Sequence, residues 1–315
     1  RTHHNISATG GSDRVRFFAS IGYLNEDGNI DNYGYNRLNL RSNIDAKLTK
    51  SLTFTLGVSG RIEKRDSPRY SADPNAWHNV PQQIIRALPY VPDTYEYEGK
   101  TYNVSTPTAS SPVAPVASIN ESGYSKSNYS YIQSNFSLKY DAPWLKGLSF
   151  KFQGAYDLTY NFSKILSNPY EVMIMNLPTI ESTSLTYYKG TDASGNSISL
   201  SESASRGYTF TTQSSVTYDN KFGKHTVGAM FLAETRENKS NALSATGYGL
   251  DFIQLDELNQ ITNKTGNGAE KFPSIGGYSG HTRVAGFVGR VNYNYDDKYY
   301  FCLLYTSPSP RDISG

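Results

Sequence analysis

Paired carboxylates are the residues in this sequence that come nearest to a catalytic arrangement. Glu234 with Glu237, or Asp251 with Asp256, could serve as the acid and base of a glycoside hydrolase, which needs two carboxyl groups flanking the scissile bond. The chain carries 28 acidic residues, so pairs at such spacings arise by chance. No further acid–base constellation accompanies them, and we expect that the chain is not an enzyme.

Metal and cofactor chemistry find little support in the sequence. His3 and His4 could bind a metal ion, but two lone histidines are more often solvated side chains. Cys302 is the single cysteine, which excludes an intrachain disulfide and a cysteine-based zinc site. The glycine pairs at 247–249 and 266–268 lack the strand–turn–helix setting of a phosphate loop and are typical of turns. We therefore expect no metal and no cofactor.

Aromatic side chains in the segment 64–127 form the remaining candidate binding site. Sugars bind by stacking on exposed rings with hydrogen-bonding groups nearby. The segment is rich in Pro and Ser, so we expect ordered extended stretches in it. The alternative is that its rings pack the segment itself or a partner protein, and this alternative stays open. The candidate substrate-binding residues are Tyr70, Trp77, His78, Tyr90, Tyr95 and Tyr97.

Composition favours strands and turns over helices. The 315 residues include 26 Tyr, 14 Phe and 26 Gly, and only 18% are charged. Aromatic residues suit strands, and Gly, Asn and Ser suit turns. The net charge of +2 gives no electrostatic reason to expect a nucleic-acid partner. No run of about 18 apolar residues is present, so no transmembrane helix is expected.

Period-two alternation of apolar and polar residues recurs along the chain and predicts an all-β protein of about ten strands. In the clearest case, 35–63, two alternating runs flank a short turn at 49–51 and predict a hairpin. The predicted strands cover 5–9, 14–24, 35–48, 52–63, 128–141, 148–160, 207–219, 225–237, 282–296 and a strand from 299.

The connections alternate between short and long. Short turns at 10–13, 49–51, 142–147, 220–224 and 296–298 alternate with long links at 25–34, 64–127, 161–206 and 238–281. A membrane β-barrel has short periplasmic turns and long extracellular loops, whereas a soluble sandwich has no such parity. Aromatic residues near both strand ends, among them Tyr129 and Tyr131 on the long-link side, fit two interfacial belts.

The polar face of the predicted strands carries many charges. Burying these charges in a dry core would cost several kcal/mol each unless they were paired. The lumen should therefore be wide and hydrated, or should face a polar plug. Ten strands do not close such a barrel, so we expect further strands and no transport by this piece alone. The predicted lumen-facing residues are Arg37, Arg41, Asp45, Lys47, Arg61, Lys139, Lys151 and Arg290.

Three segments resemble one family. FASIGYLNEDG at 18–28 resembles the strand-and-turn segment GYLNQDG of SusC/RagA-type TonB-dependent outer-membrane transporters. YNRLNLRSN at 35–43 resembles their following strand, and GRVNYNYDDKY at 289–299 resembles a later hairpin. The order and spacing agree over residues 1–301.

The resemblance implies a partial transmembrane antiparallel β-barrel, part of a 22-stranded barrel with an N-terminal plug in the outer membrane of a Gram-negative bacterium. It implies TonB-dependent import of oligosaccharides or peptides together with a SusD-like surface lipoprotein. The TonB complex would engage an N-terminal region absent from this sequence, and outer-membrane lipid would surround the wall.

Two further expectations complete the sequence analysis. Residues 302–312 resemble translated sequencing-adapter read-through, and Pro308 and Pro310 would break a barrel strand, so we expect 1–301 to be the partial receptor barrel domain and 302–315 to be a non-native tail. The alternative function is a surface-exposed β-sandwich that binds glycans, in which the apolar strand faces would pack on each other.

Overall fold

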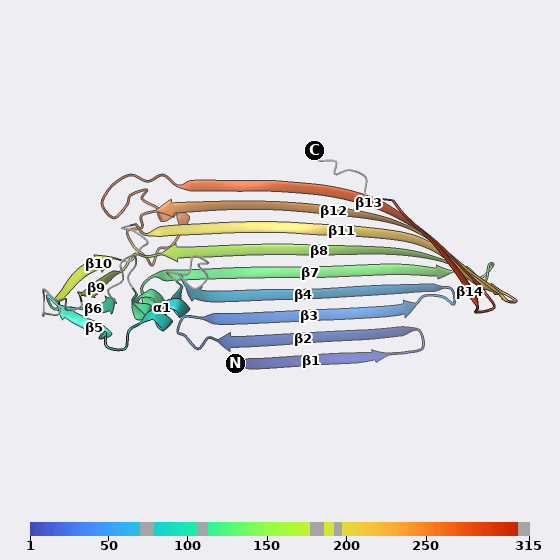
Figure 1. Cartoon of the computed structure of the whole chain (residues 1–315), viewed down its shortest axis with the longest axis horizontal. Coiled ribbons are helices and arrows are strands. Elements are labelled where there is room, and N and C mark those ends of the chain that lie inside the picture. Colours follow the sequence, from blue (N-terminus) through green and yellow to red (C-terminus); the bar gives the residue numbers. More distant parts are fainter. Residues whose placement is uncertain (70–78, 106–112, 177–185, 192–196, 308–315) are drawn as a thin grey trace.

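The computed structural model describes residues 1–69, 79–105, 113–176, 186–191 and 197–307. Ten long strands form a single curved antiparallel sheet, in which each strand pairs with the next one along the chain (Figure 1). This arrangement confirms the prediction of an all-β chain with about ten strands. The strands, in their order across the sheet, are β1 (Thr2–Gly11), β2 (Val15–Asp27), β3 (Gly34–Lys47), β4 (Leu52–Pro68), β7 (Gly123–Asp141), β8 (Leu148–Ser167), β11 (Ser199–Phe222), β12 (His225–Tyr248), β13 (Ser274–Tyr295) and β14 (Tyr299–Thr306).

The strands extend further toward the long connections than the alternation predicts. β11 and β12 each have 24 residues, whereas the predicted strands stop at 207 and 237 on that side. The reason is that both faces become polar there, so the apolar signal ends while backbone pairing continues to Ser199↔Tyr248. Strands of this length exceed the roughly 9–11 residues that cross a hydrocarbon layer.

A second, smaller sheet is built from the long connections and was not predicted as a unit. Its strand order is β10 (Thr186–Thr191), β9 (Glu171–Asn176), β6 (Lys100–Ser105) and β5 (Thr94–Tyr97). β6 pairs parallel with β9, which joins the links 64–127 and 161–206. The strands β5 and β6 agree with the extended stretches predicted in 64–127, and Figure 1 places the small sheet beyond one end of the large sheet.

Two short helices in the link 64–127 were missed. They are α1 (Val80–Arg86) and α2 (Pro115–Asn120), each with a proline in its first turn, where the lost N–H has no intrahelical partner. Six or seven residues are too few to show helical periodicity in sequence. A 3-10 turn, η1 (Leu258–Gln260), lies in the last long link. No helix in the described part of the chain is long and apolar enough to cross a membrane.

The buried cores lie in the long connections and at the end of the large sheet that adjoins them. Val80, Ala117 and Val172 form one core that ties the two helices to β9, and Leu166, Leu200 and Leu250 form another at the end of the large sheet. Lys164 Nζ lies 3.3 Å from both Glu202 and Glu257, which fixes the last long link to the sheet. The long connections are therefore folded structures attached to one end of the large sheet.

The apolar face of the large sheet is uncovered. Phe17, Phe231 and Phe287 are exposed to 46%, 53% and 47%. In the β-sandwich alternative these side chains would pack on a second sheet, and within the described residues they do not. An apolar surface of this extent needs an apolar cover, since soluble monomers rarely expose contiguous patches above a few hundred Å².

The edge strand β14 includes residues of the segment that we expect to be non-native. It pairs with β13 from Tyr295↔Tyr299 to Val288↔Thr306, and its side chains are exposed. Residues 308–315, including both prolines, lie outside the described part. Because this pairing uses backbone groups alone, many sequences can occupy the position, and we keep the proposal that residues after 301 are not native.

Two glycines in short turns give a test of the sheet geometry. Gly147 has φ +92°, and a Cβ there would lie 2.0 Å from the Asp219 carbonyl oxygen, whereas Gly223 has φ +61° with nothing within 4 Å. Left-handed backbone alone costs an alanine about 1–2 kcal/mol. In the intact protein that contains this chain, we expect Gly147→Ala to lower the temperature at which the folded band disappears on a detergent gel far more than Gly223→Ala. Equal shifts would contradict the packing of the 142–147 turn on β11.

Candidate functional site

The predicted lumen-facing residues lie on the face of the large sheet opposite the one that carries Phe17, Phe231 and Phe287. Residues paired across adjacent strands lie on the same face of the sheet. Arg37 on β3 therefore shares a face with Glu63 on β4, Tyr129 on β7 and Asn161 on β8. Successive residues two apart stay on the same face. Followed in this way, all eight predicted lumen-facing residues share one face, from Arg37, Arg41, Asp45 and Lys47 on β3 through Arg61, Lys139 and Lys151 to Arg290 on β13.

The sheet does not gather these eight residues into one site. Arg37 and Arg61 lie near the long-link end of β3 and β4, where Arg37 is directly opposite Glu63. Lys139 faces Lys151 across β7 and β8 near the short turns, and Lys139 Nζ lies 2.9 Å from Asp141. Arg290 lies on β13, five strands from β4.

An arginine–tyrosine cluster on β3, β4 and β7 is the most densely charged part of this face. The buried Glu63 carboxylate lies 3.0 Å from Arg61 Nε and 3.3 Å from Arg65 Nη2. The Arg61 guanidinium lies 5.8 Å from the centroid of the Tyr129 ring and 5.9 Å from that of Tyr131. The carboxylate thus orients two cations that in turn lie over aromatic rings.

The positions of Tyr129 and Tyr131 differ from the expected interfacial belt. Their position near the strand ends suggested an interfacial belt, which would face lipid, but register places both on the charged face beside Arg61. Ring position along a strand does not determine which face a ring occupies. The register of β7 against β4 places them there, beside Arg61.

Arg65 is a functional residue that the sequence analysis missed. It follows Arg61 and Glu63 at period two, but the predicted strand ended at 63. Its guanidinium lies 5.4 Å from the centroid of the Tyr35 ring on β3. Extending the alternation by one more residue pair would have found it.

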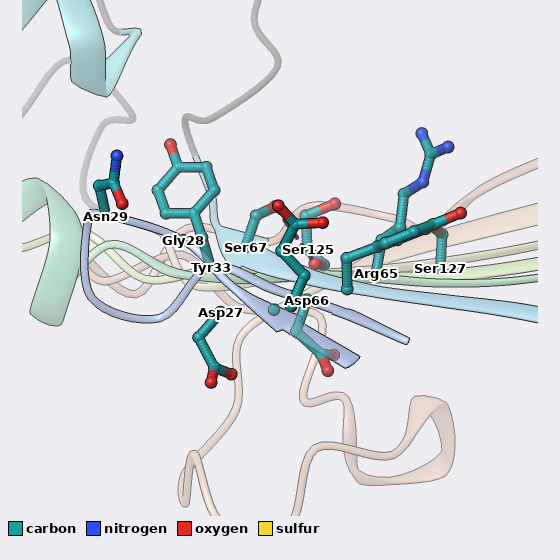
Figure 2. A pocket seen from close by; sticks show the side chains of 12 residues that line it. Asp27, Gly28, Asn29, Tyr33, Arg65, Asp66, Ser67, Ser125 and Ser127 are labelled. Atoms are coloured by element: carbon teal, nitrogen blue, oxygen red, sulfur yellow. Dashed lines mark hydrogen bonds between the residues drawn. The ribbon is translucent and has the colours of Figure 1, made fainter. Parts of the chain in front are cut away.

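A cavity of about 720 Å³ opens beside this cluster, at the long-link end of β2, β3, β4 and β7. Figure 2 shows Arg65 and Tyr33 pointing to one side of the sheet, and Asp27 and Asp66 to the other. On the side of Arg65 the cavity offers its guanidinium, the Glu26 carboxylate and serine hydroxyls, which suit hydroxyl and amide groups of a polar ligand. Its lining is Glu26, Asp27, Gly28, Asn29, Tyr33, Gly34, Tyr35, Arg65, Asp66, Ser67, Ser125 and Ser127.

The predicted aromatic site divides into three cases. Tyr70, Trp77 and His78 lie outside the described residues. Tyr95 stacks on Tyr187 with ring centroids 4.0 Å apart and packs on the core of the small sheet, so this ring serves the loop's own packing. Tyr90 and Tyr97 are exposed to 59% and 41%, and their rings stay available for a ligand or partner.

The carboxylate pairs and histidines of the sequence analysis do not form a reaction centre. Glu234 accepts a hydrogen bond from Gln213 Nε2 on the charged face, whereas Glu237 lies on the opposite face and accepts one from Tyr208. Asp256 is bound by Tyr124. In the described residues, no group of three or more His, Cys, Asp or Glu side chains could hold a metal ion.

The comparisons with known proteins agree with this geometry. No family model matches the chain. It is 24% identical over 316 residues to TonB-dependent receptor P3 of Formosa agariphila, covering 98% of this chain and 28% of that protein. It is 22% identical over 303 residues to TonB-dependent receptor P26 of the same organism, covering 95% and 27%.

Solved structures give the same result at the level of fold. The structure of the RagAB peptide transporter superposes with a TM-score of 0.66 at 21% identity, covering 95% of this chain and 31% of the solved chain. The open-open state of the RagAB peptide importer gives 0.68 at 20% identity, covering 96% and 30%. The resemblance to SusC/RagA-type TonB-dependent transporters is confirmed, the fold is that of a partial barrel wall, and the relatives are receptors and transporters, not enzymes. The chain spans less than a third of their length.

The Glu63 cluster predicts an asymmetric response to substitution. The Glu63 side chain is only 8% exposed, whereas Arg61 and Arg65 are 44% and 66% exposed and can rehydrate. Leaving a buried charge unpaired costs about 3 kcal/mol or more. In the intact protein we expect the double variant Arg61→Gln/Arg65→Gln to lower the thermal unfolding midpoint more than Glu63→Gln does. A larger loss from Glu63→Gln would contradict this account.

Proposed function

We propose that this chain forms part of the wall of a TonB-dependent importer in the outer membrane of a Gram-negative bacterium. The observation that carries the proposal is the sheet with one charged and one uncovered apolar face. A hydrocarbon layer supplies the cover that the apolar face needs, and a hydrated lumen suits the charged face. The similarity to TonB-dependent receptors supports energy coupling through TonB.

The long connections would then lie at the cell surface. Short turns join the strands at one end and folded links join them at the other, which is the parity of an outer-membrane barrel. The links carry exposed apolar side chains, with Ile85, Tyr90 and Val116 exposed to 83%, 59% and 45%. Such a surface fits a covering partner, and the family resemblance supports a SusD-like lipoprotein in that role.

The cargo that we propose is an oligosaccharide or a peptide. The relatives of known structure are named as peptide importers, and the arginine–tyrosine cluster fits either class, because guanidinium groups bind carboxylates and carbonyls while tyrosine rings stack on sugars. The lumen-facing residues, the cavity beside Arg65 and the exposed rings of Tyr90 and Tyr97 are the proposed contacts.

Charge reversal on the inner face separates these two cargo classes. Arg41 is exposed on that face near the middle of β3, opposite Ser59, and has no charged partner among the described residues, so Arg41→Glu adds negative potential to the lumen. In cells that carry the intact protein, we expect uptake of an acidic labelled peptide to fall several-fold while uptake of a neutral labelled oligosaccharide is unchanged.

Lys50→Glu, in the exposed short turn, makes the same change in net charge outside the lumen and is the matched control. Its uptake rates should equal those of the wild type. Deletion of TonB should abolish uptake in every strain. Uptake that persists without TonB, or that responds equally to both substitutions, would contradict the proposed function.

A further inference from the structure

A basic cluster lies on the apolar face of the sheet. Its side chains point away from the proposed lumen, so a role in the lumen does not account for them. Register aligns Tyr208, Lys239 and His281 in one row across β11, β12 and β13. The row on one side is Phe210, Glu237 and Arg283, and the row on the other is Arg206, Asn241 and Ser279. Following each strand by steps of two places these rows on the same face as Phe231 and Phe287.

The cluster lies on the long-connection side of Phe231 and Phe287, and beyond it the same face carries Leu243 and Ile275, exposed to 62% and 82%. Arg283 precedes Phe287 by four residues on β13, which corresponds to about 13 Å along a strand. Toward the short turns the face carries Val216, Phe231 and Val291, which are exposed to 37%, 53% and 43%. Between the phenylalanines and the basic cluster, this face of β12 carries the small residues Ala233 and Thr235.

The cluster has surplus positive charge. Within these three rows Glu237 is the single carboxylate, against the cations Arg206, Lys239 and Arg283. Glu237 Oε1 accepts hydrogen bonds from Tyr208 at 3.1 Å and Arg283 Nη2 at 3.3 Å, and lies 2.8 Å from His281 Nε2. Arg206 and Lys239 are exposed, with no carboxylate partner among the described residues.

Aromatic rings and a hollow adjoin the cations. Tyr156 on β8 stacks against Tyr208 with centroids 5.5 Å apart. Tyr160 and Arg206 border a cavity of about 680 Å³ that also includes Asn241, whose Nδ2 donates to Ser279 Oγ at 2.7 Å. Amphipathic rings beside long cationic side chains are typical of the boundary between hydrocarbon and headgroups.

We infer that Arg206, Lys239 and Arg283 bind the phosphate groups of a glycolipid in the outer leaflet. The inference rests on the proposed function, because it needs this face to meet lipid and the long connections to lie outside. Given that placement, two uncompensated cations at headgroup height require anions, and a phosphorylated headgroup supplies them in the plane of the membrane. Glu237 fixes the position of Arg283 and His281 rather than contacting the lipid.

The test uses the intact protein in detergent and native mass spectrometry with diphosphorylated lipid A. We expect the triple variant Arg206→Gln/Lys239→Gln/Arg283→Gln to lose about tenfold or more in lipid affinity, since it removes three cationic hydrogen-bond donors that can contact phosphate oxygens. The matched control is Arg236→Gln on the opposite face of β12, which should bind as the wild type does. Dephosphorylated lipid A should bind the wild type as weakly as the triple variant binds diphosphorylated lipid A.

Three results would overturn the inference. They are equal binding by the wild type and the triple variant, equal binding of phosphorylated and dephosphorylated lipid, and displacement of the lipid by millimolar inorganic phosphate alone. A change in oligomeric state in the triple variant with unchanged lipid affinity would assign the face to a second copy instead. If the wild-type protein fails to fractionate with outer membranes, the proposed function itself fails, whereas normal fractionation with unchanged lipid binding rejects only this inference.

Discussion

The structure depends on a sheet whose two faces need different surroundings. Successive side chains of a strand point to opposite faces of the sheet. A strand in which apolar and polar residues alternate therefore has one apolar face and one polar face. Here the polar face carries arginines, lysines and aspartates, and the apolar face carries phenylalanines that stay uncovered. In the proposed function, hydrocarbon covers the apolar face, and water or polar protein covers the other.

The arginine–tyrosine cluster and the basic cluster follow from this constraint. Glu63 is buried on the charged face, where Arg61 and Arg65 lie against its carboxylate, and the Arg61 guanidinium lies over the Tyr129 ring. On the other face, charged residues appear on the long-connection side of Phe231 and Phe287, at Glu237 and Arg283. The two clusters thus lie on opposite sides of one wall and meet different surroundings.

The sequence predicted the large sheet well and its connections poorly. Alternation located all ten strands, and the shared face of residues such as Arg41 and Arg290 followed from counting in twos. The predicted strands ended too early wherever both faces of a strand are polar, and for this reason Arg65 was assigned to a loop. The parallel pairing of β6 with β9 joins segments about seventy residues apart, and the helix Val80–Arg86 packs on residues of α2 and β9 that are also distant in sequence, so no local pattern predicts them. Tyr95 was expected at a ligand, but stacking on Tyr187 uses that ring.

The most direct test of whether the apolar face meets lipid is to measure how often spin labels along β12 collide with lipid-soluble and water-soluble reagents. With Cys302 replaced by serine, spin labels placed singly from 229 to 234 in the intact, membrane-reconstituted protein would report contact with oxygen, which enters lipid, and with a water-soluble nickel chelate. We predict that oxygen contact peaks at 229, 231 and 233 and nickel contact at 230, 232 and 234. Equal access of the nickel chelate at all six positions would show that the apolar face does not meet lipid and would contradict this account.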